Sequence, residues 1–254
     1  MGFLHQGHIS LIRQSKLISD VSIISIFVNP TQFGPSEDFE SYPRDLEHDI
    51  KILEDEGVDF LFLPSKEEIY SINFQTYVNV EHMSKKLEGE FRPVHFRGVT
   101  TVVLILFNCI NPDFAFFGQK DAQQVAIIKQ MIKDLKLSIK IISCPIIREP
   151  DGLAMSSRNI YLSDSERRDA LALFHSLELA RNLIESNERK SAVILSEMNE
   201  HIKNVSSANL DYIKIVDADN FELVDNLIEG NEYLILIACK IGKTRLIDNV
   251  LIKV

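Results

Sequence analysis

The sequence begins with two histidines whose spacing suits chemistry on an anion. His5 and His8 stand three residues apart in the stretch MGFLHQGH, just ahead of an apolar-periodic run. One interpretation is structural, with one histidine capping a helix and the other packed inside. A zinc site is a weaker interpretation, because no further His or Cys ligand lies nearby in the sequence. In the third, Gly2 and Gly7 let the backbone approach a phosphate, and the helix start offers free N–H groups and a positive dipole end.

A second stretch, GLAMSSRN at Gly152–Asn159, carries groups that suit a triphosphate. The hydroxyls of Ser156 and Ser157 can donate to phosphate oxygens, and the Arg158 guanidinium can bind two oxygens at once. An ordinary helix-entry loop is the alternative, since Ser and Asn favour such loops. Met155–Arg158 resembles the mobile K-M-S-K-S loop of class I aminoacyl-tRNA synthetases and nucleotidylyl transferases. An early H-x-G-H and a late loop of this kind form the paired signature of that superfamily.

Three further stretches carry polar side chains beside expected strands or helices. FVNPTQF puts Asn29 and Gln32 at the carboxyl end of the first strand, where open parallel sheets bind ligands. EGEFRPVHFRG gathers Arg92, His95 and Arg97 in what we expect to be one loop, which suits an anionic ligand.

The third stretch is FGQKDAQQ, at the end of another expected strand. Here Gly118 allows the turn and Lys120 supplies charge for a phosphate, while Asp121 either caps the following helix or binds ribose hydroxyls. Each of these stretches alone is equally well explained by a solvated turn, but together they favour a ligand site.

The segments that must position these groups alternate between strand and helix. Strands are expected at Val21–Asn29, Val58–Leu63, Asp113–Phe117 and Lys140–Cys144. Helices are expected from Pro43 to Gly57, with Leu46, Ile50 and Leu53 inward, and at Asp121–Leu135, with Val125, Ile128, Met131, Ile132 and Leu135 inward. The run Val99–Ile110 reads as a strand by propensity, but its length and the Asn111-Pro112 stop favour a buried helix. This order predicts an α/β fold, a Rossmann-like parallel sheet with helices on both faces.

The pattern changes after about Ile147. One long amphipathic helix is expected over Ser163–Ser186, with Ser163 or Asp164 as its cap, and a second over Ser191–Asn204. Strands are then expected at Leu210–Val216, Glu232–Cys239 and Arg245–Ile252, with turns at Gly230 and Gly242. This predicts two domains, 1–146 and 147–254, the second a smaller α+β domain with a mostly antiparallel sheet.

Composition sets limits on the function. A chain of 254 residues with a net charge of −10 is unlike a nucleic-acid binder, which normally has a basic face. No apolar run reaches about 18 residues and no signal-peptide pattern is found, so we expect a cytoplasmic protein without a membrane contact. Cys109, Cys144 and Cys239 are scattered, as expected of small buried apolar residues in a reducing compartment.

Taken together, the chain resembles the pantothenate synthetase (pantoate–β-alanine ligase) family over nearly its whole length. The stretches that carry the resemblance are MGFLHQGH, SIFVNPTQF, YPRDLEHD, RPVHFRGV, FGQKDAQQ, DGLAMSSRN and RLIDN. The resemblance implies a Rossmann-type nucleotide-binding domain, a smaller C-terminal lid domain and a homodimer. It also implies that pantoate and β-alanine are joined through a pantoyl adenylate, with ATP as substrate, Mg²⁺ as cofactor, and AMP and pyrophosphate released. Two rival functions are a nucleotidylyl transferase that stops at an adenylated product and a nucleotide-binding module without catalysis.

The resemblance assigns site residues by motif. The implied ATP site is Met1, Gly2, Phe3, Leu4, His5, Gln6, Gly7, His8, Gly118, Gln119, Lys120, Asp121, Ile147, Met155, Ser156, Ser157 and Arg158. The implied catalytic groups among them are His8 as proton donor, with His5, Lys120, Ser156, Ser157 and Arg158. Gln32 and Gln124 would hold pantoate, with Asn29 and His95 as further contacts to pantoate or β-alanine; the metal ligands are left unassigned.

The sequence also departs from the family pattern. The family usually has a strand and a Pro-Thr pair before the methionine of the first loop, and that strand would be central to the sheet. Here the sequence begins at Met1. In addition, Gln119 replaces a usual glutamate, Ala122 a usual aromatic residue and Val94 a usual glycine.

Overall fold

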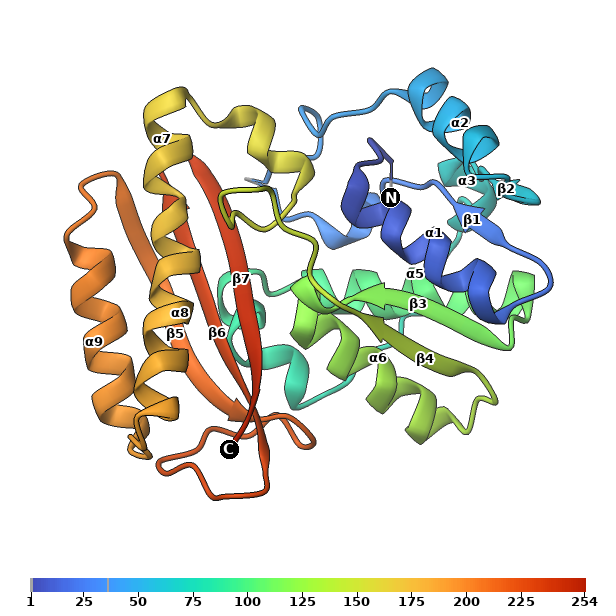
Figure 1. Cartoon of the computed structure of the whole chain (residues 1–254). Coiled ribbons are helices and arrows are strands. Elements are labelled where there is room, and N and C mark those ends of the chain that lie inside the picture. Colours follow the sequence, from blue (N-terminus) through green and yellow to red (C-terminus); the bar gives the residue numbers. More distant parts are fainter. Residues whose placement is uncertain (1, 36) are drawn as a thin grey trace. The chain divides into compact units, whose positions relative to one another are not determined.

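The computed structural model describes residues 2–35 and 37–254. The chain divides into two compact units, Met1–Ile147 and Arg148–Val254 (Figure 1). Each unit has its own sheet structure and its own core.

Unit 1 alternates helices with short parallel strands. Its helices are α1 (Gln6–Ile18), α2 (Leu46–Asp55), α3 (Lys66–Ile69), α4 (Glu88–Phe91), α5 (His95–Ile110) and α6 (Ala122–Leu135). Its strands are β1 (Ile23–Ser25), β2 (Phe60–Phe62), β3 (Phe114–Gly118) and β4 (Lys140–Cys144), and its 3₁₀ turns are η1 (Pro30–Gln32), η2 (Met83–Lys85) and η3 (Gln119–Asp121). β1 pairs with β2 and β3 with β4, both in parallel. The predicted α/β class is confirmed, although the strands described here hydrogen-bond as two separate pairs instead of one continuous sheet.

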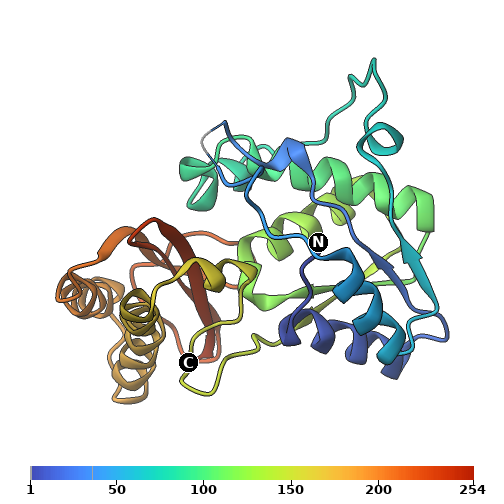
Figure 2. The ribbon, with the colours of Figure 1, turned by 90° about the horizontal axis from the view of Figure 1, so that it is seen from above.

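Helices cover both faces of the strands in unit 1. Along β2, Leu61 packs in a cluster with α1 and α2, whereas its neighbour Phe62 packs in the cluster formed by α5 and α6. Successive side chains of a strand point to opposite faces, so the two clusters lie on opposite sides of the strand layer. Figure 2 shows these two helix layers from above. The run over 99–110 is helical as predicted, within the buried helix α5.

Two details of unit 1 differ from the prediction. The strand expected over Val21–Asn29 is reduced to β1, and Val21 is 53% exposed instead of buried on both faces. Helix α2 begins at Leu46, not at Pro43, because the Asp45 carboxylate caps it by accepting the His48 N–H at 3.1 Å. Leu46, predicted to point inward, is 41% exposed, whereas Asp49 on the same helix is only 1% exposed.

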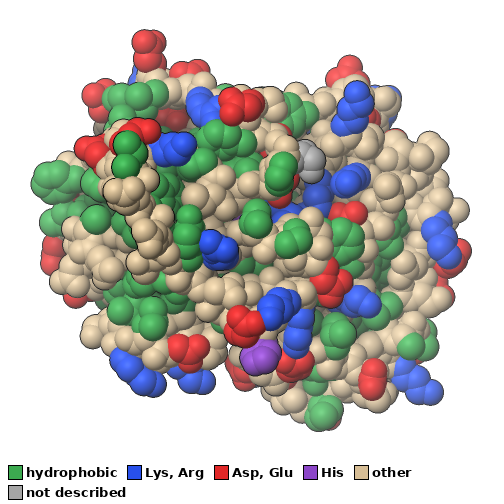
Figure 3. All heavy atoms as spheres, turned by 180° about the vertical axis from the view of Figure 1, so that it is seen from behind, with side chains coloured by type: hydrophobic (Ala, Val, Ile, Leu, Met, Phe, Trp, Pro, Cys, Tyr) green, Lys and Arg blue, Asp and Glu red, His purple; other side chains and the backbone are tan. Residues whose placement is uncertain are grey.

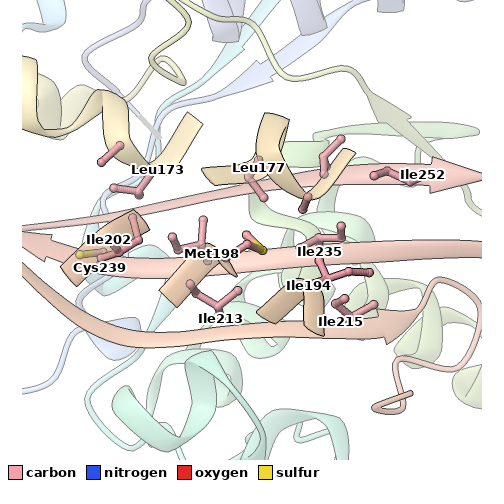
Figure 4. Packing of buried hydrophobic residues seen from close by; sticks show 14 of the residues in the cluster. Leu173, Leu177, Ile194, Met198, Ile202, Ile213, Ile215, Ile235, Cys239 and Ile252 are labelled. Atoms are coloured by element: carbon pink, nitrogen blue, oxygen red, sulfur yellow. The ribbon is translucent and has the colours of Figure 1, made fainter. Parts of the chain in front are cut away.

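Unit 2 contains a three-stranded antiparallel sheet with helices on one face. Its elements are η4 (Ser157–Tyr161), α7 (Asp164–Asp169), α8 (Leu171–Glu185), α9 (Ser191–Lys203), β5 (Ala208–Asp217), β6 (Glu232–Ile241) and β7 (Thr244–Lys253). The strand order is β5-β6-β7, which confirms the antiparallel prediction. Figure 4 shows the core, in which Leu177 from α8 and Met198 from α9 meet Ile235 of the central strand.

The single long helix predicted over 163–186 is in fact two helices. Ser163 caps α7 in a reciprocal box with Glu166, as expected. The helix then breaks at Ala170, which is fully buried and accepts the Leu173 N–H, a three-residue step in place of the usual four.

The surface mixes charges of both signs. On the face drawn in Figure 3, blue Lys and Arg side chains are interspersed with red Asp and Glu side chains. Among the helices that the structure describes, none has the length and apolar character needed to cross a membrane.

Candidate active site

The two histidines of the first loop cap helix α1 reciprocally. His5 is the N-cap residue, and its Nδ1 accepts the Gly7 N–H at 3.1 Å. The His8 Nδ1 in turn accepts the His5 N–H at 3.3 Å, and the ring centroids lie 4.0 Å apart. A capping box usually pairs Ser or Thr with Glu or Gln; here two imidazoles form it. The prediction that a histidine caps this helix is therefore confirmed.

This capping fixes the tautomer of both neutral rings. A backbone N–H can only donate, so Nδ1 of His5 and of His8 is an acceptor and carries no proton. In the neutral state the proton of each ring is then on Nε2, which makes Nε2–H the donor that each ring can offer to a ligand. The expectation of free backbone N–H groups at this helix start needs correction, since the N–H groups of His5 and Gly7 are bound by the rings.

Burial keeps His8 uncharged. The side chain is only partly accessible and is surrounded by protein atoms, so desolvation lowers the pKa of His8 well below its ordinary value, with further contributions from His5 and Lys120. Without a bound anion His8 is therefore a neutral hydrogen-bond donor near pH 7.

Helix α1, which the first loop precedes, packs against β3, and β3 leads into the FGQKDAQQ stretch. Lys120 of that stretch is one of the charges that lower the pKa of His8. Gly118 has φ −75°, a conformation open to any residue, and a Cβ added there would meet nothing within 4 Å. The turn therefore does not require glycine, contrary to the prediction, and the backbone has open space beside it. Gln119 is half-buried and accepts the Ser143 hydroxyl at 2.7 Å.

Of the two roles predicted for Asp121, helix capping is wrong. The residue stands at the N-cap position of α6 and is exposed, but its carboxylate makes no capping hydrogen bond in the structure as described. Three residues further on, Gln124 is half-buried in the first turn of α6. The neighbouring Gln123 is 3% exposed and structural, since it bonds Met83 O, Lys86 O and Glu88 N.

Asn29 and Gln32 lie together just past β1. Both hydrogens of the Asn29 amide are used, one on Gln32 Oε1 at 3.2 Å and one on Gly98 O at 3.1 Å. Its Oδ1 accepts the Tyr70 hydroxyl at 2.8 Å. Asn29 is 2% exposed, so it orients the Gln32 amide rather than presenting itself to a ligand.

Helix α5 holds the Gln32 segment from the other side. A Cβ at Gly98 would lie 2.5 Å from Thr31 O and 2.6 Å from the Gln32 N and Cα atoms. The backbone of η1 can therefore approach α5 this closely only at a glycine. Sequence reasoning missed Gly98, although its place in the matched RPVHFRGV stretch was a signal.

Arg92, His95 and Arg97 do not form one cationic loop. Arg92 donates two bonds to Glu37 Oε2, at 3.0 and 2.6 Å, and a third to His95 Nε2 at 3.2 Å. His95 begins α5, and its Nδ1 lies 3.1 Å from Gln32 O, to which it donates because Nε2 is the acceptor from Arg92. Arg97 stacks over the Tyr77 ring at 3.9 Å. Arg92 and His95 instead support the Gln32 segment, whereas Arg97 packs elsewhere.

In unit 2 the GLAMSSRN stretch forms a capped turn. Ser156 is the N-cap of η4 and accepts the Arg158 N–H at 3.3 Å, which is the geometry of the ordinary-turn interpretation. Ser157 is 6% exposed, while Met155 and Arg158 are half-buried. Asn159 bonds Glu149 Oε1 at 3.0 Å and Ala154 O at 3.2 Å, so it ties the two sides of the turn together.

The base of this turn is anchored by residues that the sequence reasoning did not single out. Arg148 pairs with both oxygens of Asp248, at 2.6 and 3.0 Å, and donates to Gly152 O at 3.0 Å. Its guanidinium lies 4.9 Å from the centre of the Phe174 ring. Gly152 has φ +102° and lies so close to that ring that a Cβ would be 2.3 Å from it. Asp248 falls in the matched RLIDN stretch, the one signal available.

The other residues predicted for the ATP site differ in their exposure. Gly2 and Leu4 are buried, Phe3 and Ile147 half-buried, Gln6 exposed on the first turn of α1, and Met1 lies outside the described residues. No three His, Cys, Asp or Glu side chains in 2–35 and 37–254 are grouped as a metal site.

Comparison with known proteins gives matches over almost the whole chain. The family model described as pantoate-beta-alanine ligase matches residues 1–251. The pantothenate synthetases of Caldicellulosiruptor bescii and Thermotoga petrophila are 52% and 50% identical to the chain, over 100% and 99% of it and 89% of each relative.

Solved structures agree as well. A pantothenate synthetase from Thermus thermophilus superposes with a TM-score of 0.94 at 39% identity, covering 98% of this chain and 90% of that one. A pantoate-beta-alanine ligase from Francisella tularensis, complexed with beta-gamma ATP and beta-alanine, gives a TM-score of 0.79 at 39% identity, with 99% and 87% covered. The chain therefore belongs to the pantoate–β-alanine ligase family.

Proposed function

We propose that the chain joins pantoate to β-alanine at the expense of ATP, through a pantoyl adenylate. The observation that carries the proposal is the pair of imidazoles whose tautomers are fixed beside Lys120, in a chain whose family membership is established. A neutral N–H donor and a nearby ammonium group are suited to oxygens on which negative charge develops.

The chemistry requires activation of an unreactive carboxylate. A pantoate carboxylate oxygen forms a bond to the α-phosphorus of ATP, and the bond from that phosphorus to the bridging oxygen breaks, releasing pyrophosphate. The β-alanine nitrogen then bonds to the acyl carbon, AMP departs with the former carboxylate oxygen, and the amine loses a proton to solvent. No protein nucleophile takes part, so the protein aligns the reactants and stabilises developing charge.

We assign His5, His8 and Lys120 to the phosphates on this basis. The open space beside Gly118 suits a nucleotide that approaches the backbone, and the carboxylate of Asp121, which does not cap α6, suits ribose hydroxyls. Ser156, Ser157 and Arg158 are proposed as further phosphate ligands, and Ile147 as an adenine contact.

Pantoate is assigned to the two glutamines. Because Asn29 donates to Gln32 Oε1, the Gln32 Nε2 group is the one proposed to donate to the pantoate hydroxyl or carboxylate. Gln124 is the second proposed ligand. Asn29 and His95 were candidate contacts to the substrates, but their hydrogen bonds to Gln32 favour a positioning role.

Magnesium and the homodimer belong to the same proposal. Mg²⁺ commonly keeps several waters and binds through substrate phosphates with one or two carboxylates. We therefore propose that it arrives with the triphosphate, where it would neutralise charge on the leaving pyrophosphate. Sedimentation of the purified chain tests the dimer.

Pyrophosphate exchange tests the reaction. Labelled pyrophosphate should enter ATP when pantoate and magnesium are present and β-alanine is absent. Exchange that requires the amine would refute the two-step route. ATP binding without exchange would favour the non-catalytic module, and an adenylated product that β-alanine does not consume would favour the nucleotidylyl transferase.

A further inference from the structure

The geometry points to Asp49 as the positioning residue of the first loop, a carboxylate on α2 that holds the backbone from which His5 and His8 act. This inference rests on the proposed function, which gives the loop its task. Asp49 acts through the loop and is not proposed to touch a substrate.

The contacts are direct and buried. Asp49 Oδ2 accepts the Phe3 N–H at 2.7 Å, and Oδ1 accepts the Leu4 N–H at 2.6 Å. The carboxylate is 1% exposed, so it has given up its hydration for these two bonds. A buried charge is retained at such a place only if its hydrogen-bonding partners replace the lost water.

The loop needs such a clamp because Phe3 is in an unfavourable backbone conformation. Phe3 has φ +54°, in the left-handed region that an aromatic residue rarely adopts, and it follows Gly2, whose φ of +138° is open to glycine. Strained backbone persists only where the surrounding structure determines it, and such strain is common at functional sites. The two N–H groups that Asp49 binds are those of the strained residue Phe3 and of Leu4, which follows it.

The clamp is continuous with the two imidazoles. The next N–H along the chain, that of His5, is bound by His8 Nδ1, and Gly7 N–H is bound by His5 Nδ1. A shift of residues 3 and 4 would therefore move the His5 backbone and with it the bond that fixes the His8 tautomer. Meanwhile α2 itself is fixed by Leu53, which packs in the cluster of Leu4 and Ile12. The position of α2 therefore determines the positions of the His5 and His8 rings.

Asp49→Asn is the variant that tests the inference. It keeps the shape of the side chain but turns an amide NH₂ towards one of the two backbone N–H groups. Asp45→Asn is the matched control, because Asp45 caps the same helix through His48 N–H and does not bond the loop. Both variants are compared with the parent in a pre-steady-state assay with saturating labelled ATP, pantoate and magnesium and no β-alanine, so that each active site turns over once and the amplitude counts the active sites.

The rate constant and the amplitude of this assay report different properties. A displacement of catalytic groups of the order of 1 Å lowers a rate roughly 100-fold, so the D49N rate constant should fall by about that factor with the amplitude kept. D45N should keep the parent rate constant. If D49N lowers only the amplitude or the melting temperature, Asp49 is merely structural and the inference is overturned. Poor recovery of D49N does not prevent the test, since the rate constant is read from the folded fraction alone.

Two further measurements separate this inference from its alternatives. If extra magnesium restores the D49N rate constant, Asp49 is a metal ligand and the inference is wrong. The ¹⁵N shifts of the His8 ring in the unliganded chain should show the Nε2–H tautomer in the parent and in D45N, and a mixture of tautomers in D49N. An unaltered His8 tautomer in D49N would also overturn the inference. The ring shifts do not depend on catalysis, so a parent chain without exchange activity would end the proposed function and leave the clamp testable.

Discussion

Substitution of Gly98 by alanine tests whether the approach of η1 to α5 sets the position of Gln32. The new Cβ would lie 2.5 Å from Thr31 O and 2.6 Å from Gln32 N and Cα. Favourable separations for carbon are about 3.5–4.0 Å, so η1 has to move by roughly 1 Å. Misplacement of this size costs about 100-fold in rate, so kcat/KM for pantoate should fall by about that factor, equivalent to about 2.7 kcal/mol.

The assay is pantoate-dependent pyrophosphate exchange at saturating ATP, with ATP affinity measured separately. ATP affinity should change little, because the three atoms nearest to the new Cβ all belong to Thr31 and Gln32 and none to the first loop or η3. Val103→Ala is the control, a buried position on α5 that loses atoms instead of gaining them. A Gly98→Ala enzyme whose kcat/KM for pantoate equals that of the Val103→Ala enzyme would refute the reasoning, as would an equal loss in ATP affinity.

Three other changes have defined outcomes. Gln32→Ala and Gln124→Ala should each lower kcat/KM for pantoate by about one to two decades, because a hydrogen bond to a charged group contributes about 1.5–3 kcal/mol. An equally large loss of ATP affinity would contradict the assignment of these two residues to pantoate. His8→Ala should slow adenylation about 100- to 1000-fold, yet use supplied pantoyl adenylate at near the parent rate; equal loss in both half-reactions of a folded variant would exclude the phosphate role. Burial raises the pKa of Cys239 to about 11 from 9.0, so the thiol stays protonated in the fold where the unfolded chain ionises. Stability should therefore decline between about pH 9 and 11, by at most about 2–3 kcal/mol, and Cys239→Ala should remove that part of the slope in denaturant melts.

Much of the fold follows from local patterns. The antiparallel sheet of unit 2 was predictable because glycines mark the turns between its apolar strands, and Gly242 indeed has φ +57° between β6 and β7. The start of α2 was not predictable from the apolar spacing. It depends on the Asp45 cap. The inward orientation of Asp49 was not predictable either, because its partners lie 45 and 46 residues away and a carboxylate otherwise indicates a solvent-facing side.

Part of the candidate site was likewise predictable from the sequence, and part was not. Motif spacing singled out His5, His8 and Gln32, and the structure gives each a defined hydrogen-bond partner. The grouping of Arg92 with His95 as a cationic loop was wrong, because Glu37, 55 residues from Arg92, neutralises it. Pairing across such distances leaves no local signal in a single sequence, so side chains that brace a site are harder to predict than those that line it.

Strands β6 and β7 are joined through Gly242 and Lys243 alone, with Ile241 opposite Thr244, so their ten-residue pairing begins at a very short loop. Hairpins of this kind form in about 1–10 μs, whereas parallel strands must first close a long stretch of chain. In unit 1, β1 and β2 pair Ile23 with Phe60 across the whole of α2. When the full chain refolds, we therefore expect β6 and β7 of unit 2 to pair before β1 and β2 of unit 1. Pulsed hydrogen exchange would then show protection of the β6 amides earlier than of the β1 amides, and the lag between them would measure how much later the strands beside the His5–His8 loop form.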